Sequence, residues 1–221
     1  MKRVLVIAPH PDDEILGCGG TMLKHIEAGD EVYVCIVTHA APPIYPEGAS
    51  AAIQEAARQC HRWMGVKETF FLNFPTVMLE TVDRYKINDA INKIVQENKI
   101  DVLYVPHYGD MQKDHQIVAE ACMVAARPKY AHRVKAVYGY ETMSETAWNA
   151  PNVQNEFIPN SFVDVSDYLE KKKKALLFYD SQLSPFPDSR SLESIEALAK
   201  YRGALMHMNA AEAFMLLREL K

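Results

Sequence analysis

The amino-acid sequence predicts an α/β fold in which a mostly parallel β-sheet is flanked by helices. Two observations support this prediction. Over the first two-thirds of the chain, continuous apolar runs rich in Val, Ile and Leu alternate with segments whose apolar residues recur at helical spacing. The chain of 221 residues is also long enough to bury one substantial core, so we expect a single domain over residues 1–221.

Five apolar runs predict the strands of the sheet. They are Arg3–Ala8, Glu31–Thr38, Glu68–Asn73, Asp101–Pro106 and Lys135–Tyr140. Between them, helical periodicity predicts helices over Gly20–Ala28, Ser50–Met64, Val82–Asn98 and His115–Ala126. Because strands that alternate with helices are joined by right-handed crossovers, we expect a Rossmann-like parallel sheet.

The pattern changes near Thr142, where the chain becomes polar and irregular over residues 144–159. A short apolar run at Phe162–Val165 then predicts one more strand. Helical periodicity returns afterwards and predicts three helices, over Asp167–Tyr179, Leu192–His207 and Ala210–Leu220. The sequence therefore predicts a C-terminal helical extension beside the sheet.

Charge and composition argue against several functional classes. The formal net charge of -5 argues against nucleic acid as a partner, because a phosphate-binding surface favours a basic face. The first apolar run breaks at Pro9-His10-Pro11, too early for an export signal, and no stretch is long enough to span a membrane. The four cysteines lack metal-binding spacing and indicate reduced, buried thiols, so we expect a cytoplasmic protein.

Two loops that follow predicted strands are unusually rich in side chains that can bind metal. The residues concerned are His10, Asp12, Asp13 and Glu14 after the first strand, and His107, Asp110, Asp114 and His115 after the fourth. In open α/β sheets, ligands bind outside the carboxyl ends of the strands, where loops converge. We therefore expect both loops to face the same ligand.

The types and positions of three of these residues indicate a metal site. His10 and Asp13 are close together in one turn, and His115 is expected beside them. Two imidazoles and one carboxylate form a zinc set that leaves a coordination position open for water, although Fe²⁺ also accepts such ligands. A neighbouring carboxylate, Asp12, would then act as general base. Taken singly, each residue also fits an ordinary turn or helix cap, so the prediction depends on their convergence.

The glycines that follow the first loop allow an alternative, a nucleotide- or methyl-donor-binding enzyme with a Rossmann-like sheet. In Gly17-Cys18-Gly19-Gly20-Thr21-Met22, however, methionine stands where a dinucleotide-binding loop needs a small residue. The second strand ends in Thr38-His39 rather than in an acid that would bind a ribose. We therefore expect the glycines to serve tight turns and close packing of helix against sheet.

The segment Ala8-Pro9-His10-Pro11-Asp12-Asp13-Glu14, followed by Gly17-Cys18-Gly19-Gly20, resembles the opening motif of the LmbE-like (PIG-L) N-acetylglucosaminyl deacetylases. Gly109-Asp110 and Lys113-Asp114-His115 are similar to the second motif of that family. The resemblance covers nearly the whole chain through further segments, which are Phe178–Gln182, Ser189–Ser191, Tyr201–Gly203 and Ala211–Phe214.

The resemblance implies an LmbE-like fold and a defined chemistry. It implies that zinc is held by His10, Asp13 and His115, and that Asp12 is the general base. The implied reaction is hydrolysis of the acetamide of an N-acetylated amino sugar or its glycoside, which releases acetate and a free amine. We assign Asp114 to the catalytic group as well, where it would orient a neighbour or cap a helix.

Three positions depart from the family pattern. Gln112 stands where many relatives have a histidine, and Ala52 and Thr76 stand where relatives often carry an arginine and an acid. Glutamine can donate a hydrogen bond but cannot deliver a proton at neutral pH, so we expect Gln112 to contact the substrate. Asp12 would then serve as both base and acid, and recognition of the sugar is expected to differ.

Two further side chains are candidate substrate contacts. Arg190 lies in a proline-bounded loop and would bind a hydroxyl or an anionic group, or else form a surface ion pair. His107 directly follows a strand and would line the pocket or make a hydrogen bond within the protein. Side-chain type alone leaves both choices open.

The sequence therefore predicts a metal-dependent amidohydrolase that deacetylates a small N-acetylated sugar. Two alternatives stay open. One is the nucleotide- or methyl-donor-binding enzyme, and the other is a family member that has lost catalysis and serves as a binding module. Homo-oligomerisation also stays open, because only analogy with related folds favours it.

Overall fold

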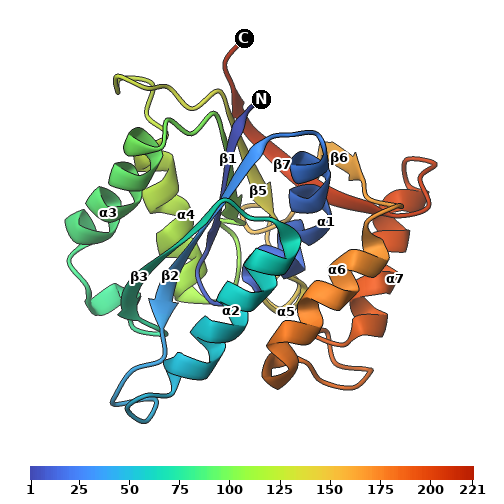
Figure 1. Cartoon of the computed structure of the whole chain (residues 1–221), viewed down its shortest axis with the longest axis horizontal. Coiled ribbons are helices and arrows are strands. Elements are labelled where there is room, and N and C mark those ends of the chain that lie inside the picture. Colours follow the sequence, from blue (N-terminus) through green and yellow to red (C-terminus); the bar gives the residue numbers. More distant parts are fainter.

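The computed structural model describes residues 1–221 and contains a seven-stranded sheet. Its strands are β1 (Arg3–Ala8), β2 (Glu31–His39), β3 (Glu68–Pro75), β4 (Val102–Pro106), β5 (Ala136–Tyr140), β6 (Ser161–Asp164) and β7 (Ala211–Glu219). In space they follow the order β3-β2-β1-β4-β5-β7-β6, in which the first five are parallel and β7 is antiparallel to both of its neighbours. The predicted mostly parallel sheet flanked by helices is confirmed (Figure 1).

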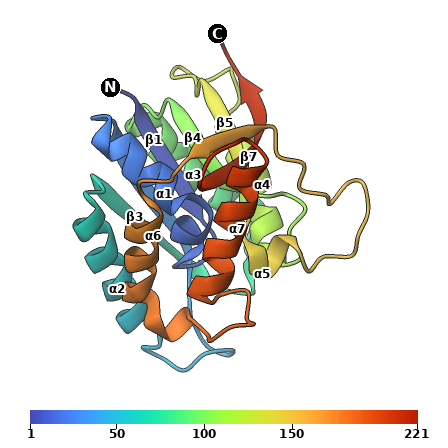
Figure 2. The same cartoon turned by 90° about the vertical axis from the view of Figure 1, so that its right-hand side faces the viewer.

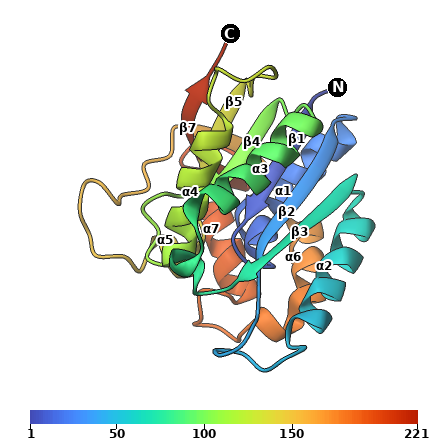
Figure 3. The same ribbon diagram turned by 90° about the vertical axis from the view of Figure 1, so that its left-hand side faces the viewer.

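Helices cover both faces of the sheet (Figure 1, Figure 3). The α-helices are α1 (Asp13–Glu27), α2 (Ser50–Met64), α3 (Arg84–Glu97), α4 (Lys113–Ala125), α5 (Met143–Thr146), α6 (Leu169–Leu176) and α7 (Leu192–Ala204), and the 3-10 helices are η1 (Leu79–Thr81) and η2 (Leu177–Gln182). Alternate residues of β1 point to opposite faces of the sheet. Val4 and Val6 join a core with α1, α2, α6 and α7, whereas Leu5 and Ile7 join a core with α3 and α4. Burial on both faces explains the continuous apolar run of β1.

The order of the strands changes direction beside β1. From β1 the chain adds β2 and then β3 on one side, and it returns to add β4 and then β5 on the other. The loops after β1 and β4 therefore lie next to each other at the carboxyl edge of the sheet, where open α/β sheets bind ligands. This topology brings the two ligand-rich loops together.

The segment Ala210–Leu220 forms a strand, so the predicted final helix is wrong. β7 lies between β5 and β6 and forms antiparallel ladders with both. Its Ala, Glu, Met and Leu residues have high helix propensity, but hydrogen bonding and packing within the sheet outweigh that local preference. Along the chain α6 and α7 therefore lie between β6 and β7, two strands that pair directly with each other in the sheet, and both helices pack beside the sheet (Figure 2).

α1 begins at Asp13, well before its predicted start at Gly20. The glycine cluster therefore lies inside a helix rather than in a turn. A side chain on Gly17 would place its Cβ 2.2 Å from the ring of Tyr140, and one on Gly20 would place it 2.7 Å from Val165. Of the two roles predicted for these glycines, close packing is the one that the structure supports.

No helix combines the length and the apolarity that crossing a membrane requires. The four cysteines are buried and unpaired, as the sequence predicts. Cys18 and Cys60 lie in the core with α1 and α2, whereas Cys35 and Cys122 lie in the core with α3 and α4. They act there as small apolar side chains.

A buried ion pair in the C-terminal part of the chain is hydrogen-bonded to α1. Lys172 Nζ of α6 lies 2.6 Å from Glu212 Oε1 of β7, and each side chain is only 4% exposed. The Glu212 carboxylate also accepts hydrogen bonds from the backbone N–H groups of Gly20 and Thr21. Lys172 also donates to the carbonyl of Leu16. Each charge depends on the other, because an unpaired charge in the interior is strongly destabilising.

We expect Lys172→Met to lower the free energy of unfolding by about 3–5 kcal/mol, because the Glu212 carboxylate would stay buried without its counter-charge. Denaturant-induced unfolding measures this loss. Lys174→Met, at an exposed position of the same helix, is the matched control and should change the free energy of unfolding by less than about 0.5 kcal/mol. Equal stability of the two variants would contradict the role of the ion pair.

Candidate active site

Three of the predicted site residues lie where β1 leads into α1. His10 and Asp12 are in the turn, and Asp13 is the first residue of α1. The Thr38 hydroxyl donates to the Pro9 carbonyl, and the His10 N–H donates to Asp13 Oδ2, so the turn is held from both sides. Asp12 has a left-handed backbone conformation, with a φ of 112°, directly before α1 begins. The adjacent side chains of Asp12 and Asp13 contact different groups as a result.

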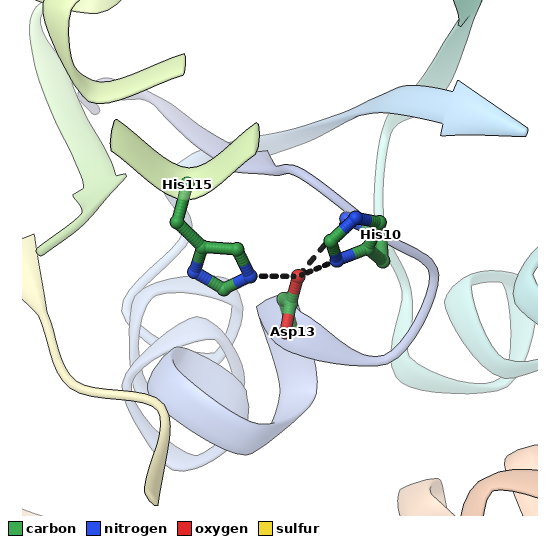
Figure 4. A group of neighbouring side chains, drawn as sticks. All are labelled: His10, Asp13 and His115. Atoms are coloured by element: carbon green, nitrogen blue, oxygen red, sulfur yellow. Dashed lines mark hydrogen bonds and ion pairs between the residues drawn. The ribbon is translucent and has the colours of Figure 1, made fainter. Parts of the chain in front are cut away.

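The structure brings His10, Asp13 and His115 together (Figure 4). Asp13 Oδ2 lies 3.3 Å from His10 Nδ1 and 3.3 Å from His115 Nε2, and the three ligand atoms lie within 4.8 Å of one another. Tetrahedral zinc with bonds of about 2.1 Å holds its ligand atoms roughly 3.4 Å apart, so this spacing suits that ion. His115 Nε2 and Asp13 Oδ1 are buried without a hydrogen-bond partner, a lack that a bound cation would remedy.

The charges around these three ligands favour a cation between them. Burial alone would raise the pKa of Asp13, but His115 and His10 hold that pKa well below its usual value. Burial alone would lower the pKa of His115, but Asp13 and Asp110 raise it to about 10. The centre of the site therefore favours a positive charge, which either a proton or a metal ion can provide.

A carboxylate lies behind each imidazole. Asp114 Oδ2 lies 3.1 Å from His10 Nε2, and Asp110 Oδ2 lies 2.8 Å from His115 Nδ1. When the outer ring nitrogen gives its hydrogen to a carboxylate, the inner nitrogen is left free to bind a metal and the ring is held in orientation. Both histidines thus have the partner that metal-binding histidines usually have.

These two carboxylates are held in place in turn. Asp114 accepts hydrogen bonds from the N–H groups of Val77 and Leu79. The Thr146 hydroxyl donates to Asp110 Oδ1 at 2.6 Å. From the sequence we assign Asp114 to the catalytic group, where it would orient a neighbour or cap a helix, but we assign no role to Asp110. The available signal is the position of Asp110 within the second ligand-rich loop.

Gln112 caps α4 and also borders the site. Its Oε1 accepts a hydrogen bond from the Asp114 N–H, 2.9 Å away, where α4 begins. Its Nε2 lies 3.2 Å from His10 Nε2. When His10 Nδ1 faces the metal position, His10 Nε2 carries the hydrogen and donates it to Asp114. Gln112 then contacts the outer edge of the His10 ring.

Asp12 is buried beside the metal ligands and pairs with Arg190. Arg190 Nη1 lies 3.0 Å from Asp12 Oδ2, and Arg190 Nε donates to Ser144 Oγ. The other oxygen, Asp12 Oδ1, is buried without a hydrogen-bond partner. Burial raises the pKa of Asp12 well above its usual value, although Arg190 acts in the opposite direction. A carboxylate with a free oxygen and a raised pKa is suited to accept a proton.

A cavity of about 520 Å³ opens beside these residues. Its lining includes His10, Asp12, Gln112, Glu145 and Arg190. The volume is within the range of pockets that bind small molecules. Sequence reasoning assigns no role to Glu145, whose Oε2 is buried without a partner and whose pKa is raised by burial.

His107 does not line this cavity. It is buried, its Nε2 lies 3.0 Å from the carbonyl oxygen of Asn155, and its ring packs beside Tyr108 and Phe157. Of the two roles expected for His107, the structure favours a hydrogen bond within the protein. Arg190, by contrast, forms an ion pair within the site itself.

Comparison with known families agrees with this geometry. Residues 5–126 match the family model described as PIG-L: GlcNAc-PI de-N-acetylase. The match covers more than half of the chain, so the chain belongs to the PIG-L family. The resemblance inferred from the sequence motifs is confirmed, and so is the predicted enzyme class, a hydrolase that acts on N-acetyl amides, at the level of the family.

Two curated relatives and one solved structure illustrate the similarity. The chain is 29% identical to the "Uncharacterized deacetylase YaiS" of Escherichia coli, over 79% of this chain and 89% of that protein. It is 28% identical to the diacetylchitobiose deacetylase of Thermococcus kodakarensis, over 85% of this chain and 72% of that protein. The fold is shared with the N,N'-diacetylchitobiose deacetylase of Pyrococcus horikoshii, with a TM-score of 0.78 and 22% identity over 98% of this chain and 84% of that one.

We expect Asp110→Asn to weaken zinc binding about 10- to 100-fold, because His115 would lose the carboxylate that orients it. Competition against a chromophoric chelator measures the affinity. Asp101→Asn is the matched control, since this carboxylate accepts the Arg3 N–H and lies away from the three ligands. Wild-type zinc affinity in Asp110→Asn would show that the carboxylate does not support the site.

Proposed function

We propose that the protein is a zinc-dependent deacetylase that removes the acetyl group from the amide nitrogen of an N-acetylated amino sugar or its glycoside. The observation that carries this proposal is the convergence of His10, Asp13 and His115 beside a buried carboxylate, Asp12. Three ligands leave a coordination position open, which is typical of catalytic rather than structural zinc. The donor set also accepts Fe²⁺, and the metal test below distinguishes the two ions.

The proposed reaction uses few residues. Zinc held by His10, Asp13 and His115 would supply a Lewis acid that polarises the acetyl carbonyl and lowers the pKa of a water molecule to about 7. Asp12 removes a proton from the attacking water through its free Oδ1, while Arg190 holds Oδ2. The water oxygen bonds to the acetyl carbon, and the C–N bond breaks with its electron pair passing to nitrogen. Asp12 returns the proton to that nitrogen, so that the free amine and acetic acid leave, and the acid gives its remaining proton to solvent to become acetate.

Asp12 alone would carry both proton transfers. Gln112 cannot deliver a proton, and its amide is engaged in capping α4. Asp114 accepts hydrogen bonds from two backbone N–H groups and faces His10, so we assign it to orientation of that ligand. Asp12 combines a position in the cavity with an oxygen that has no partner.

The proposed substrate class follows from the cavity and from the relatives. A cavity of about 520 Å³ has room for a small molecule, and its lining offers charged and amide side chains for sugar hydroxyl groups. The relative from Thermococcus kodakarensis is named for deacetylation of diacetylchitobiose, an N-acetylated sugar. We therefore propose that this chain acts on an N-acetylated sugar as well.

The nucleotide-binding alternative suits the site less well. The glycines that would face a phosphate lie inside α1, where Gly17 packs against Tyr140 and Gly20 against Val165. The carboxylates of Asp12 and Asp13 would also repel a phosphate placed near the turn. The remaining alternative, a binding module without catalysis, is decided by assay.

We expect the zinc-loaded protein to release acetate from a member of a panel that includes N-acetylglucosamine, its glycosides and diacetylchitobiose. A chelator should abolish this release, because the Lewis acid would be removed. Adding back Zn²⁺ or Fe²⁺ to the chelated protein identifies which ion restores turnover. Absence of acetate release across the panel by protein loaded with Zn²⁺ and by protein loaded with Fe²⁺ would favour the binding module instead.

We expect Asp12→Asn to retain the metal and to lose turnover by roughly 10²- to 10⁴-fold, since an amide cannot take the proton from water. Metal content and acetate release are measured on the same preparation. Asp89→Asn, at an exposed position of α3, is the control and should keep full activity. Full turnover by metal-loaded Asp12→Asn would rule out the proposed base.

A further inference from the structure

The backbone of Asp12 has a conformation that needs support. Its φ is 112° and its ψ is -27°, in the left-handed region that residues with a Cβ rarely occupy. Such a conformation persists only where the surrounding structure holds it, and it is found most often at functional sites. The question is which groups hold Asp12.

Hydrogen bonds fix both sides of this residue. The Asp12 N–H donates to Glu14 Oε2, 3.1 Å away. The Asp12 carbonyl accepts from the N–H groups of Ile15 and Leu16, at 3.0 and 2.9 Å. The second pair belongs to the first turn of α1, which any helix provides. The hydrogen bond to Glu14 is different, because its acceptor is a side chain.

Glu14 is held by two other parts of the chain. The Tyr179 hydroxyl of η2 donates to Glu14 Oε1 at 2.5 Å, and His61 Nε2 of α2 lies 3.0 Å from the same oxygen. The opposite nitrogen of His61 lies 2.9 Å from the hydroxyl of Thr69 in β3. The Glu14 carboxylate therefore has donors on both of its oxygens.

This cluster is fully enclosed. Glu14 and Tyr179 are 0% exposed and His61 is 2% exposed. None of the three lines the cavity beside Asp12, so none is placed to touch a substrate there. An acid in the first turn of a helix is ordinarily explained by the helix dipole, and it then points to solvent. A buried glutamate with a full set of donors implies a more specific role.

We infer that Glu14, anchored by His61 and Tyr179, is a positioning residue that holds Asp12 in its left-handed conformation, an inference that rests on the proposed function only for its effect on turnover. The orientation of the Asp12 peptide sets the direction of its side chain. That direction places Oδ2 on Arg190 and leaves Oδ1 free. Glu14 acts through Asp12 and does not itself meet the reacting atoms.

The test is Glu14→Gln, which keeps the size of the side chain but removes an acceptor that three donors require. We expect kcat to fall roughly 10- to 100-fold, because small displacements of a reacting group are costly, whereas KM should change less than about threefold. Metal content should match wild type. Tyr179→Phe removes one donor to Glu14 and should lower kcat in the same direction but less.

Glu212→Gln is the matched control. This carboxylate is also buried and also accepts backbone N–H groups of α1, but it does so at Gly20 and Thr21, away from Asp12. It should lower the unfolding midpoint without a selective loss of kcat in the folded, metal-loaded protein. Equal kcat in Glu14→Gln and Glu212→Gln, at full metal loading, would overturn the inference.

A crystal structure of Glu14→Gln gives a readout that does not depend on activity. We expect the φ of Asp12 to leave the left-handed region, or its contact with Arg190 to break. An unchanged Asp12 and an intact Arg190 contact would overturn the inference even if turnover falls. If the wild-type protein deacetylates nothing in the panel, the proposed function fails, while the crystal structure still decides whether Glu14 positions Asp12.

Discussion

The contact of one carboxylate, Asp13, with two imidazoles from distant parts of the chain is the constraint on which the rest of the site depends. His10 is a near neighbour of Asp13 in the turn after β1, but His115 lies in the first turn of α4, directly after the loop that follows β4. The two loops meet only because the strand order changes direction between β1 and β4. The architecture of the sheet and the chemistry of its edge are therefore linked at this single residue.

Around that contact, several acidic side chains are buried and each has its own partners. Asp110 and Asp114 face the two histidines, Asp12 faces Arg190, and Glu14 faces His61 and Tyr179. Buried carboxylates are tolerated only when they are paired or hydrogen-bonded in this way. The partners come from the turn after β1, from α2, α4 and η2, and from the loop before α7, so the packing of distant segments fixes the electrostatics of one turn.

Local pattern predicts part of this structure and tertiary contact decides the rest. The apolar runs of β1 and β4 and the acids and histidines that follow them are visible in the sequence, so the sheet and its ligand-rich edge could be predicted. β7 could not, because its residues favour helix and only pairing with β5 and β6 makes it a strand. The roles of Asp110 and Glu14 depend on hydrogen bonds to Thr146, His61 and Tyr179, which no local spacing reveals.

The short helix α5 has a consequence for how this protein can diversify. Its consecutive side chains Ser144, Glu145 and Thr146 contact Arg190, line the cavity and brace Asp110, respectively. One helical turn thus links the lining of the pocket to Asp110, the carboxylate that supports the metal-ligand candidate His115. An exchange within α5 that reshapes the lining of the pocket therefore also changes the groups that contact Arg190 and hold Asp110.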